Sequence, residues 1–162
     1  MTKYWNKPIK KEWIKDRITN SHPDGTIPWA KEFGTYLARK GDKAFEDKNL
    51  TKPKFRNNRD VKRKELTTNQ LRKFFGEVKR LQTFKDFPEE EFAMLKPKLA
   101  YAVARVGDED AKINDFYDVL QEGIDLVNNK TEFKNFIKIF EAIVAYHKAA
   151  EESKLELSNK NH

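Results

Sequence analysis

The chain has 162 residues and a formal net charge of +7, and its 38% hydrophobic and 12% aromatic content is enough to bury the core of one domain. It has no cysteine, which excludes a disulfide framework and thiolate chemistry and favours a reducing compartment. No segment has the apolar length of a secretory signal or a membrane span, so we expect one cytoplasmic helical domain over residues 1–162.

The charge is unevenly distributed along the chain. Residues 1–84 contain 22 Lys and Arg against 10 Asp and Glu, a net charge of +12, whereas residues 85–162 contain 11 against 16, a net charge of −5. This division indicates that one half meets a polyanion while the other builds the core or meets protein partners. A merely solvated basic surface is the alternative.

The apolar residues recur at intervals of three and four, and no long stretch alternates with period two. The sequence therefore predicts an all-α fold, a compact bundle of about five to six helices. The segment KPIKKEWIKDRI predicts a short first helix with one side formed by Trp5, Ile9 and Trp13. After the loop-like NSHPDGTIP, a second helix is indicated by Trp29, Phe33, Tyr36 and Leu37.

Residues 48–64 contain eight Lys or Arg, one acid and few apolar residues. Such a segment contributes little to a core, so we expect a mobile basic loop before the central helices. Phe55, beside Arg56, is a candidate for stacking on unpaired bases, as are Tyr4 and Trp5. Each of these rings could equally anchor a loose segment.

A helix start is marked in KRKELTTNQLRKFFGEVKRLQ, residues 62–82. Thr67 and Gln70 have the spacing of a capping box, and Leu66 is placed to pack on Leu71. At 100° per residue the apolar side chains form one arc, made of Leu71, Phe74, Phe75, Val78 and Leu81. The opposite arc is basic and is centred on Arg72, Gly76 and Lys79, with Lys73 and Arg80 beside them.

Gly76 costs about 1 kcal/mol relative to Ala inside a helix, and it lies among the basic residues. A bare backbone there would let a phosphate or a neighbouring chain come close. The alternative is that Gly76 contacts another helix of the same chain and that the basic residues are solvated.

The acidic half predicts three further helical segments. The first has Pro88 at its first position, followed by Glu89–Glu91, and Pro97 should kink it or start a new helix. The next is capped by Asp108 and the last by Thr131. Small residues at Ala100, Ala102 and Ala104 permit close helix approach, and residues 153–162 are expected to be a frayed tail.

The basic loop and the 62–82 helix together could align several cations along one track. Neither segment has a helix-turn-helix, finger or zipper signature, so the pattern favours binding to a nucleic acid backbone without sequence readout.

Three segments, LTTNQLRKFFGEVKRL, LKPKLAYAVAR and EFKNFIKIFEAIVAYHK, resemble the small helical subunit of the type III-A CRISPR interference (Csm) complex over roughly residues 64–150. The resemblance implies a non-catalytic subunit that stacks in several copies along guide RNA and target RNA, contacts their backbone and touches other subunits. The family's basic motif positions fall on Arg72, Lys79, Lys98 and Arg105. Further candidate RNA-binding residues are Lys73, Arg80, Lys96 and the loop cations Lys62, Arg63 and Lys64.

No specific sequence motif indicates a catalytic function. His22, His147 and His162 lack partners at metal-ligand spacing, and the acids at 89–91 and 108–110 stand where helix starts favour them. We therefore expect neither an enzyme nor a cofactor. The other hypothesis is a helical scaffold whose basic half docks an acidic protein partner and whose alanine surface mediates self-association.

Overall fold

The structure is a computed structural model that describes residues 4–40 and 63–160, with side chains described up to residue 153. Its described residues form helices and no strand, which confirms the all-α fold. The helices are α1 (Lys11–Lys15), α2 (Thr26–Ala38), α3 (Thr68–Leu81), α4 (Glu89–Ala93), α5 (Leu95–Val106), α6 (Ile113–Asp125) and α7 (Lys130–Lys160). Most of the expected basic loop lies outside the described residues.

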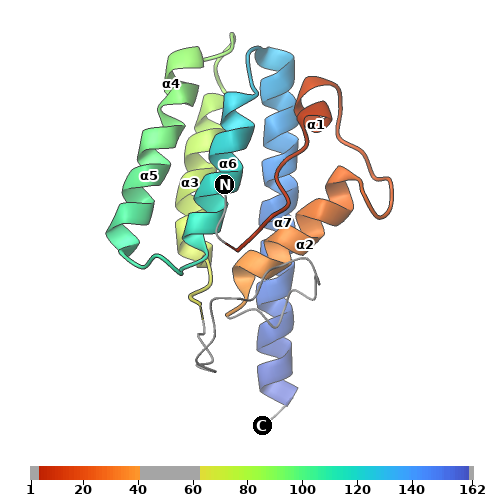
Figure 1. Ribbon diagram of the computed structural model, residues 1–162, viewed down its shortest axis with the longest axis vertical. Coiled ribbons are helices and arrows are strands. Elements are labelled where there is room, and N and C mark those ends of the chain that lie inside the picture. The colour runs from red at the N-terminus through yellow and green to blue at the C-terminus, as the bar shows by residue number, and fades with distance from the viewer. Residues whose placement is uncertain (1–3, 41–62, 161–162) are drawn as a thin grey trace.

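The long helix α7 runs the length of the molecule, and the other helices pack around it (Figure 1). Helix α2 crosses α7 in the most extensive contact, and α1 packs on α7 nearby. On the other side, α3 contacts α7, α4 and α5, and α5 packs on α6. The α2 crossing is close because Gly34 has no side chain: a Cβ there would lie 2.8 Å from the Ile143 carbonyl oxygen and 2.9 Å from the His147 nitrogen.

The apolar arc predicted for α3 faces the core. Leu71, Phe74, Val78 and Leu81 are buried, and Phe75 is half-buried. Rings from three helices meet there: the ring centroid of Phe74 lies 5.7 Å from those of both Phe116 of α6 and Phe140 of α7. The burial of this one stripe fixes α3 on α7, because each large apolar side chain removed from water contributes about 1.5 to 3 kcal/mol.

The predicted capping box is confirmed. The Thr67 N–H donates to the Gln70 side-chain oxygen at 2.9 Å, and the Gln70 N–H donates to the Thr67 hydroxyl at 3.1 Å. Leu66 and Leu71 are both buried, as expected for residues that pack together around the cap. His147 Nε2 lies 2.6 Å from the Leu66 carbonyl oxygen, so this buried histidine joins α7 to the segment before α3.

Two predicted caps are wrong. The last helix is capped by Asn129, whose side-chain oxygen accepts the Glu132 N–H at 2.9 Å, and not by Thr131. Asp108 accepts the Asp110 N–H in the turn before α6, which begins only after Lys112. At the start of α7 the capping oxygen comes from the neighbouring asparagine. Before α6 the Asp108 carboxylate accepts a hydrogen bond within its own turn and so does not cap the helix.

The proline predictions hold within a few residues. The segment that begins at Pro88 breaks at Met94, so Pro97 falls in the first turn of α5. Its missing N–H is harmless there because first-turn N–H groups have no intrahelical acceptor. Helix α7 continues to Lys160, so the backbone of residues 153–160, part of the expected frayed tail, is helical.

The first helix is shorter than predicted. Only Lys11–Lys15 is helical, and Trp5 and Ile9 are buried from the segment before it. The indole N–H groups of Trp5 and Trp29 both donate to the Lys7 carbonyl, at 2.6 and 2.9 Å. This shared acceptor fixes the N-terminal segment against α2 and uses the carbonyl that a helix from Lys7 would have needed.

A buried ionic network, formed by Tyr36, Arg63, Lys112 and Asp115, joins α2 to α6. Arg63 Nη1 lies 3.2 Å from Asp115 Oδ2, and the Tyr36 hydroxyl donates to the same oxygen at 2.7 Å. Lys112 Nζ donates to the carbonyls of Tyr36 and Arg39 at 2.6 and 2.7 Å. Burial raises the pKa of Asp115, against the opposing effects of the Tyr36 hydrogen bond and the Arg63 charge.

Arg63 therefore has a different position from the one expected of an RNA-binding loop cation. Its side chain is 1% exposed, and its charge is directed at Asp115. Local composition could not reveal this pairing, because the partner is 52 residues away in sequence. Arg63 is not available to a surface track.

Candidate nucleic-acid interface

A groove with a volume of about 450 Å³ lies between α3 and α5. Its apolar floor is formed by Leu66, Phe74, Leu99, Val106, Ile113 and Phe116. Its polar rim is formed by Gln70, Lys73, Glu77, Lys98 and Arg105. The remaining lining residues are Tyr101 and Ala102 of α5. With three cations and one carboxylate, the lining carries a net charge of +2.

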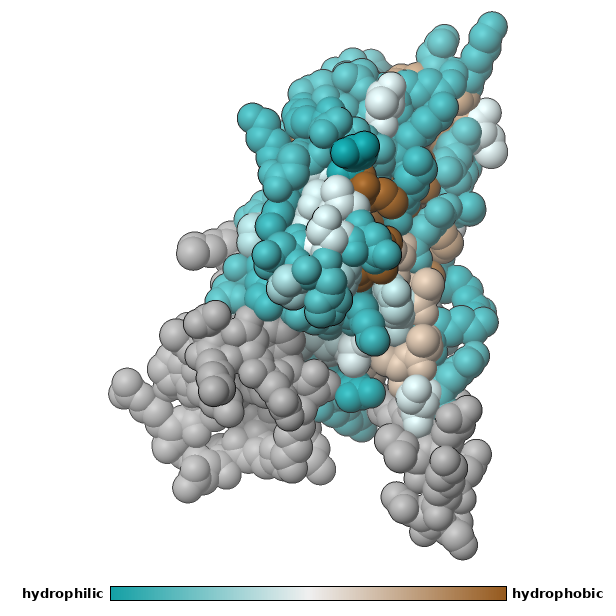
Figure 2. Space-filling view, turned by 90° about the vertical axis from the view of Figure 1, so that its right-hand side faces the viewer, coloured by the Kyte–Doolittle hydropathy of each residue, from teal (hydrophilic) through white to brown (hydrophobic). Residues whose placement is uncertain are grey.

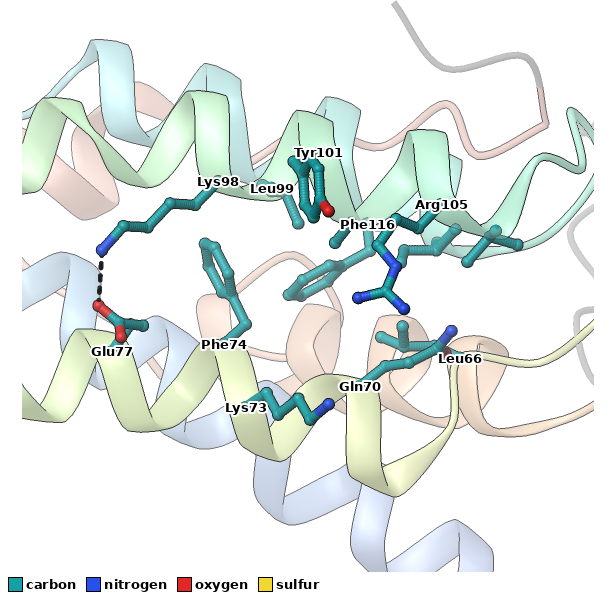
Figure 3. A pocket seen from close by; sticks show the side chains of 13 residues that line it. Leu66, Gln70, Lys73, Phe74, Glu77, Lys98, Leu99, Tyr101, Arg105 and Phe116 are labelled. Carbon is teal, nitrogen blue, oxygen red and sulfur yellow. Dashed lines mark hydrogen bonds and ion pairs between the residues drawn. The ribbon is translucent and has the colours of Figure 1, made fainter.

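Helical spacing explains why these rim residues meet. On α3, Gln70, Lys73 and Glu77 are separated by three and four residues and share the side turned toward α5. On α5, Lys98 and Arg105 are two turns apart and share the side turned toward α3. Figure 3 shows Lys98 meeting Glu77 at one end of the groove and Arg105 reaching from α5 toward α3 at the other end.

Glu77 is the acidic member of the rim. It accepts Lys98 Nζ at 3.0 Å and lies 3.5 Å from Arg80 Nη2. The hydrogen bond from Lys98 is the main cause that lowers the pKa of Glu77, so the carboxylate is charged at neutral pH. These groups are exposed, and ion pairs of this kind contribute at most about 1 kcal/mol to stability. An incoming anion could therefore displace Glu77 from Lys98 at small cost.

Tyr101 is a groove residue that the sequence patterns did not single out. Its side chain is 65% exposed, and the Arg105 guanidinium lies 6.0 Å from its ring centroid. A tyrosine and an arginine four residues apart on one helix face were the available signal. The alanines of the same segment indicated helix packing instead.

The basic arc of α3 is divided between two directions. We call Arg72, Lys79 and Arg80 the ridge cations; all three are exposed on α3. Lys79 Nζ lies 3.4 Å from Glu141 of α7, so Lys79 points away from the groove, whereas Arg80 Nη2 lies 3.5 Å from Glu77 at the groove rim. The structure thus brings Lys73 together with Lys98 and Arg105, and it leaves Arg72 and Lys79 outside that group.

Gly76 lies in the middle of the ridge. Apart from its chain neighbours and the nearby backbone of α3 itself, no described residue would come within 4 Å of a Cβ added there. The alternative that this glycine accommodates another helix of the same chain is therefore wrong for the part of the chain that the structure describes. Its cost to the helix, about 1 kcal/mol, is not offset by packing.

The other predicted residues have different surroundings. Lys64 is exposed just before α3, Lys96 pairs with Asp125 at 2.6 Å, and Lys62 lies outside the described residues. Among the candidate stacking rings, Trp5 is buried, and the Tyr4 ring is covered by the Arg63 guanidinium at 3.9 Å. Phe55 and Arg56 lie outside the described residues.

The other chemistry that the described residues offer is limited. Residues 4–40 and 63–153 contain no group of three His, Asp or Glu side chains placed to hold a metal ion. Within that same part of the chain, each helix is too short or too polar to cross a membrane.

Figure 2 shows the side of the molecule that carries α1 and α2, whose surface is mostly hydrophilic with a small hydrophobic area near its middle.

The family described as Csm2 Type III-A matches residues 44–153, which is more than half of the chain. No curated protein and no solved structure matches this chain. The match begins just before the basic loop, includes both helices of the groove and ends within α7.

Proposed function

Because the chain belongs to the Csm2 type III-A family and is a subunit of a type III-A CRISPR complex, we propose that it binds the guide or target RNA backbone there. In this proposal the chain is a non-catalytic structural subunit of cytoplasmic antiviral defence. Base pairing between the RNA strands supplies the sequence specificity, and this chain supplies positive charge on a rigid helical support.

The observation that carries the proposal is the convergence of Lys73, Lys98 and Arg105 on one groove. They come from two helices and are opposed by one carboxylate. The ridge cations add further exposed positive charge on α3 outside the groove. A phosphate chain that runs over α3 would meet exposed cations on both sides of Gly76, where no side chain keeps it at a distance.

The physical basis is release of counterions. Each phosphate that the protein neutralises frees condensed cations, so binding weakens as salt rises. For a single strand, each such contact adds about −0.7 to the slope of log affinity against log salt. Backbone contacts carry no sequence information, so unrelated RNAs should bind alike.

The test is fluorescence anisotropy of labelled single-stranded RNA, titrated with the full chain at several salt concentrations. We expect the Lys73→Ala/Arg105→Ala variant to bind unrelated RNAs more weakly by a similar factor, with a salt slope shallower by about 1.4, twice the single-contact value. The Arg72→Ala/Lys79→Ala variant tests the ridge in the same way. Circular dichroism checks that each variant is folded.

The matched control is Arg17→Ala/Lys31→Ala. It also removes one Arg and one Lys, but from exposed positions near α1 and on α2, away from the groove. If all three double variants lose affinity equally, only net charge matters, and the assigned surface is wrong. If the full chain binds no RNA at low salt, the proposal fails.

The scaffold hypothesis is favoured by one observation, the apolar floor of the groove below a basic rim, which could receive an apolar side chain of an acidic protein partner. It predicts that the groove variant loses assembly with other subunits or copies and keeps its RNA affinity. Light scattering of the free chain, together with assembly of the complex from its subunits, separates the two functions.

A further inference from the structure

We propose that the groove between α3 and α5 receives an unpaired nucleobase that stacks on Tyr101, while Lys73 and Arg105 contact the neighbouring phosphates. This inference rests on the proposed RNA-binding function and deepens it, because it adds a base subsite to the backbone contacts. It assigns Tyr101, which no basic motif includes, as a binding residue.

The exposure of Tyr101 is the first support. Among the described residues, the large hydrophobic side chains that are exposed are Met94, at 53%, and Tyr101, at 65%. The Tyr101 ring lies at the groove, beside the guanidinium of Arg105 on the next turn of the helix. An aromatic face next to a cation is the combination that single-strand binding sites present to a base and its phosphate.

The shape of the groove is the second support. Its volume of about 450 Å³ falls within the usual range for small-ligand sites, about 300 to 1,000 Å³. Phe74 and Phe116 lie between α3 and α5 behind the rim (Figure 3). A base has apolar faces and a polar edge, so its face suits this floor, and its edge can meet Gln70 at the rim. A base inside a duplex is stacked and paired, so only a splayed base could enter.

The charge of the rim decides between occupants. An apolar side chain of a protein partner would fill the floor but would cover Lys73, Lys98 and Arg105 without supplying anions, and desolvated unpaired cations are costly. A nucleotide fills the floor and neutralises the rim at once. The net charge of +2 therefore favours a nucleotide over an apolar side chain, and the exposed ring of Tyr101 favours it over an acidic segment, whose carboxylates have no aromatic face to stack there.

The test compares Tyr101→Leu with the unaltered full chain, using RNA that carries one 2-aminopurine base. Loss of the ring should weaken binding about 5- to 150-fold, the range for one base stacked on an aromatic side chain. The salt slope should stay unchanged, because no phosphate contact is removed. Binding to the unaltered chain should quench the 2-aminopurine fluorescence, and Tyr101→Leu should lose this quenching. Tyr101→Trp should retain both properties.

Two controls separate this inference from the proposed function. Met94→Leu alters the other exposed hydrophobic residue, outside the groove lining, and should leave affinity unchanged. An RNA with abasic sites keeps the phosphates, so Tyr101→Leu should bind it as well as the unaltered chain does. If Tyr101→Leu binds the normal RNA with unchanged affinity, the base subsite is overturned while backbone binding stands. If the chain binds no RNA, both proposals fail.

Discussion

The buried ionic network and the α3–α5 groove use positive charge in opposite ways. In the network, Arg63 and Lys112 are enclosed and directed at Asp115 and at backbone carbonyls. In the groove, three cations line one surface with a single carboxylate, Glu77, which pairs with Lys98. The comparison shows that a cation can serve the fold or remain available for a ligand, so the net charge of a sequence overstates what a polyanion can reach.

Arg63→Ala should have the largest effect on stability of any single substitution in either region. It leaves Asp115 buried without its charge partner, and breaking a buried pair in this way costs about 3 to 5 kcal/mol. Urea unfolding at neutral pH measures the loss. The matched control is Arg72→Ala on the ridge, where Arg72 is exposed, and its effect should stay within about 0.5 kcal/mol.

The pH dependence of Arg63→Ala sharpens the comparison. Burial already raises the pKa of Asp115, and removal of the arginine charge raises it further. The folded variant then binds a proton more tightly than the unfolded chain does, so its stability deficit against the parent should shrink as pH falls through the raised pKa. A deficit that grows toward low pH would contradict the assigned pairing.

Gly34→Ala tests the packed side of the molecule. A methyl group there would lie 2.8 Å from the Ile143 carbonyl, and α7 would have to move. Overpacking of this kind costs about 1 to 3 kcal/mol, well above the gain in helix propensity. A thermal or urea denaturation curve that shows stabilisation would mean that α2 and α7 are not so closely packed.

The parts of the fold that the sequence predicted well depend on neighbours within a turn or two. The capping box of α3 needs only Thr67 and Gln70, and its buried stripe follows from helical period. The shortened α1 was not predictable in this way, because the Lys7 carbonyl is taken by the indole N–H of Trp29, 22 residues away. Local patterns determined where helices form, and a distant hydrogen-bond donor changed where α1 begins.

The candidate site shows the same division. The basic arc of α3 was visible from helical period alone, but which of its cations face α5 depends on how the two helices pack. Lys73 therefore lies in the groove, while Lys79 turns toward Glu141. Arg63 is held in the core by Asp115. A sequence read alone shows the angle of a side chain on its own helix and not the helix that it faces.

Gly76→Ala makes the same change as Gly34→Ala, but on the solvent-exposed side of α3. No described residue obstructs the added methyl group, so the substitution should stabilise the chain by about 1 kcal/mol through helix propensity. If an RNA backbone approaches the ridge closely, the same methyl group should lower RNA affinity. Denaturation and anisotropy on one variant measure both changes. A stabilised variant with unchanged affinity would remove Gly76 from the proposed contact surface.

Glu77→Gln should have the smallest effect on stability, and it changes only the exposed rim of the groove. Because hydrogen bonding from Lys98 lowers the pKa of Glu77, this ion pair persists at neutral pH and contributes stability that is lost only as pH falls through the lowered pKa. The substitution removes the competing charge from the groove and frees Lys98 and Arg80 for phosphate. Stability should change by less than about 1 kcal/mol, since the pair is exposed.

RNA affinity of Glu77→Gln should rise a few-fold, and the salt dependence should steepen because more cations reach phosphate. Glu141→Gln is the matched control, since it frees Lys79 on the ridge by the same change of charge. A larger gain from Glu77→Gln than from Glu141→Gln would mean that RNA uses Lys98 and Arg80 more than the side of α3 turned toward α7. Equal gains would mean that the RNA strand runs along the exposed side of α3, between Glu77 and Glu141. The groove would then lie beside the RNA and would not contain it.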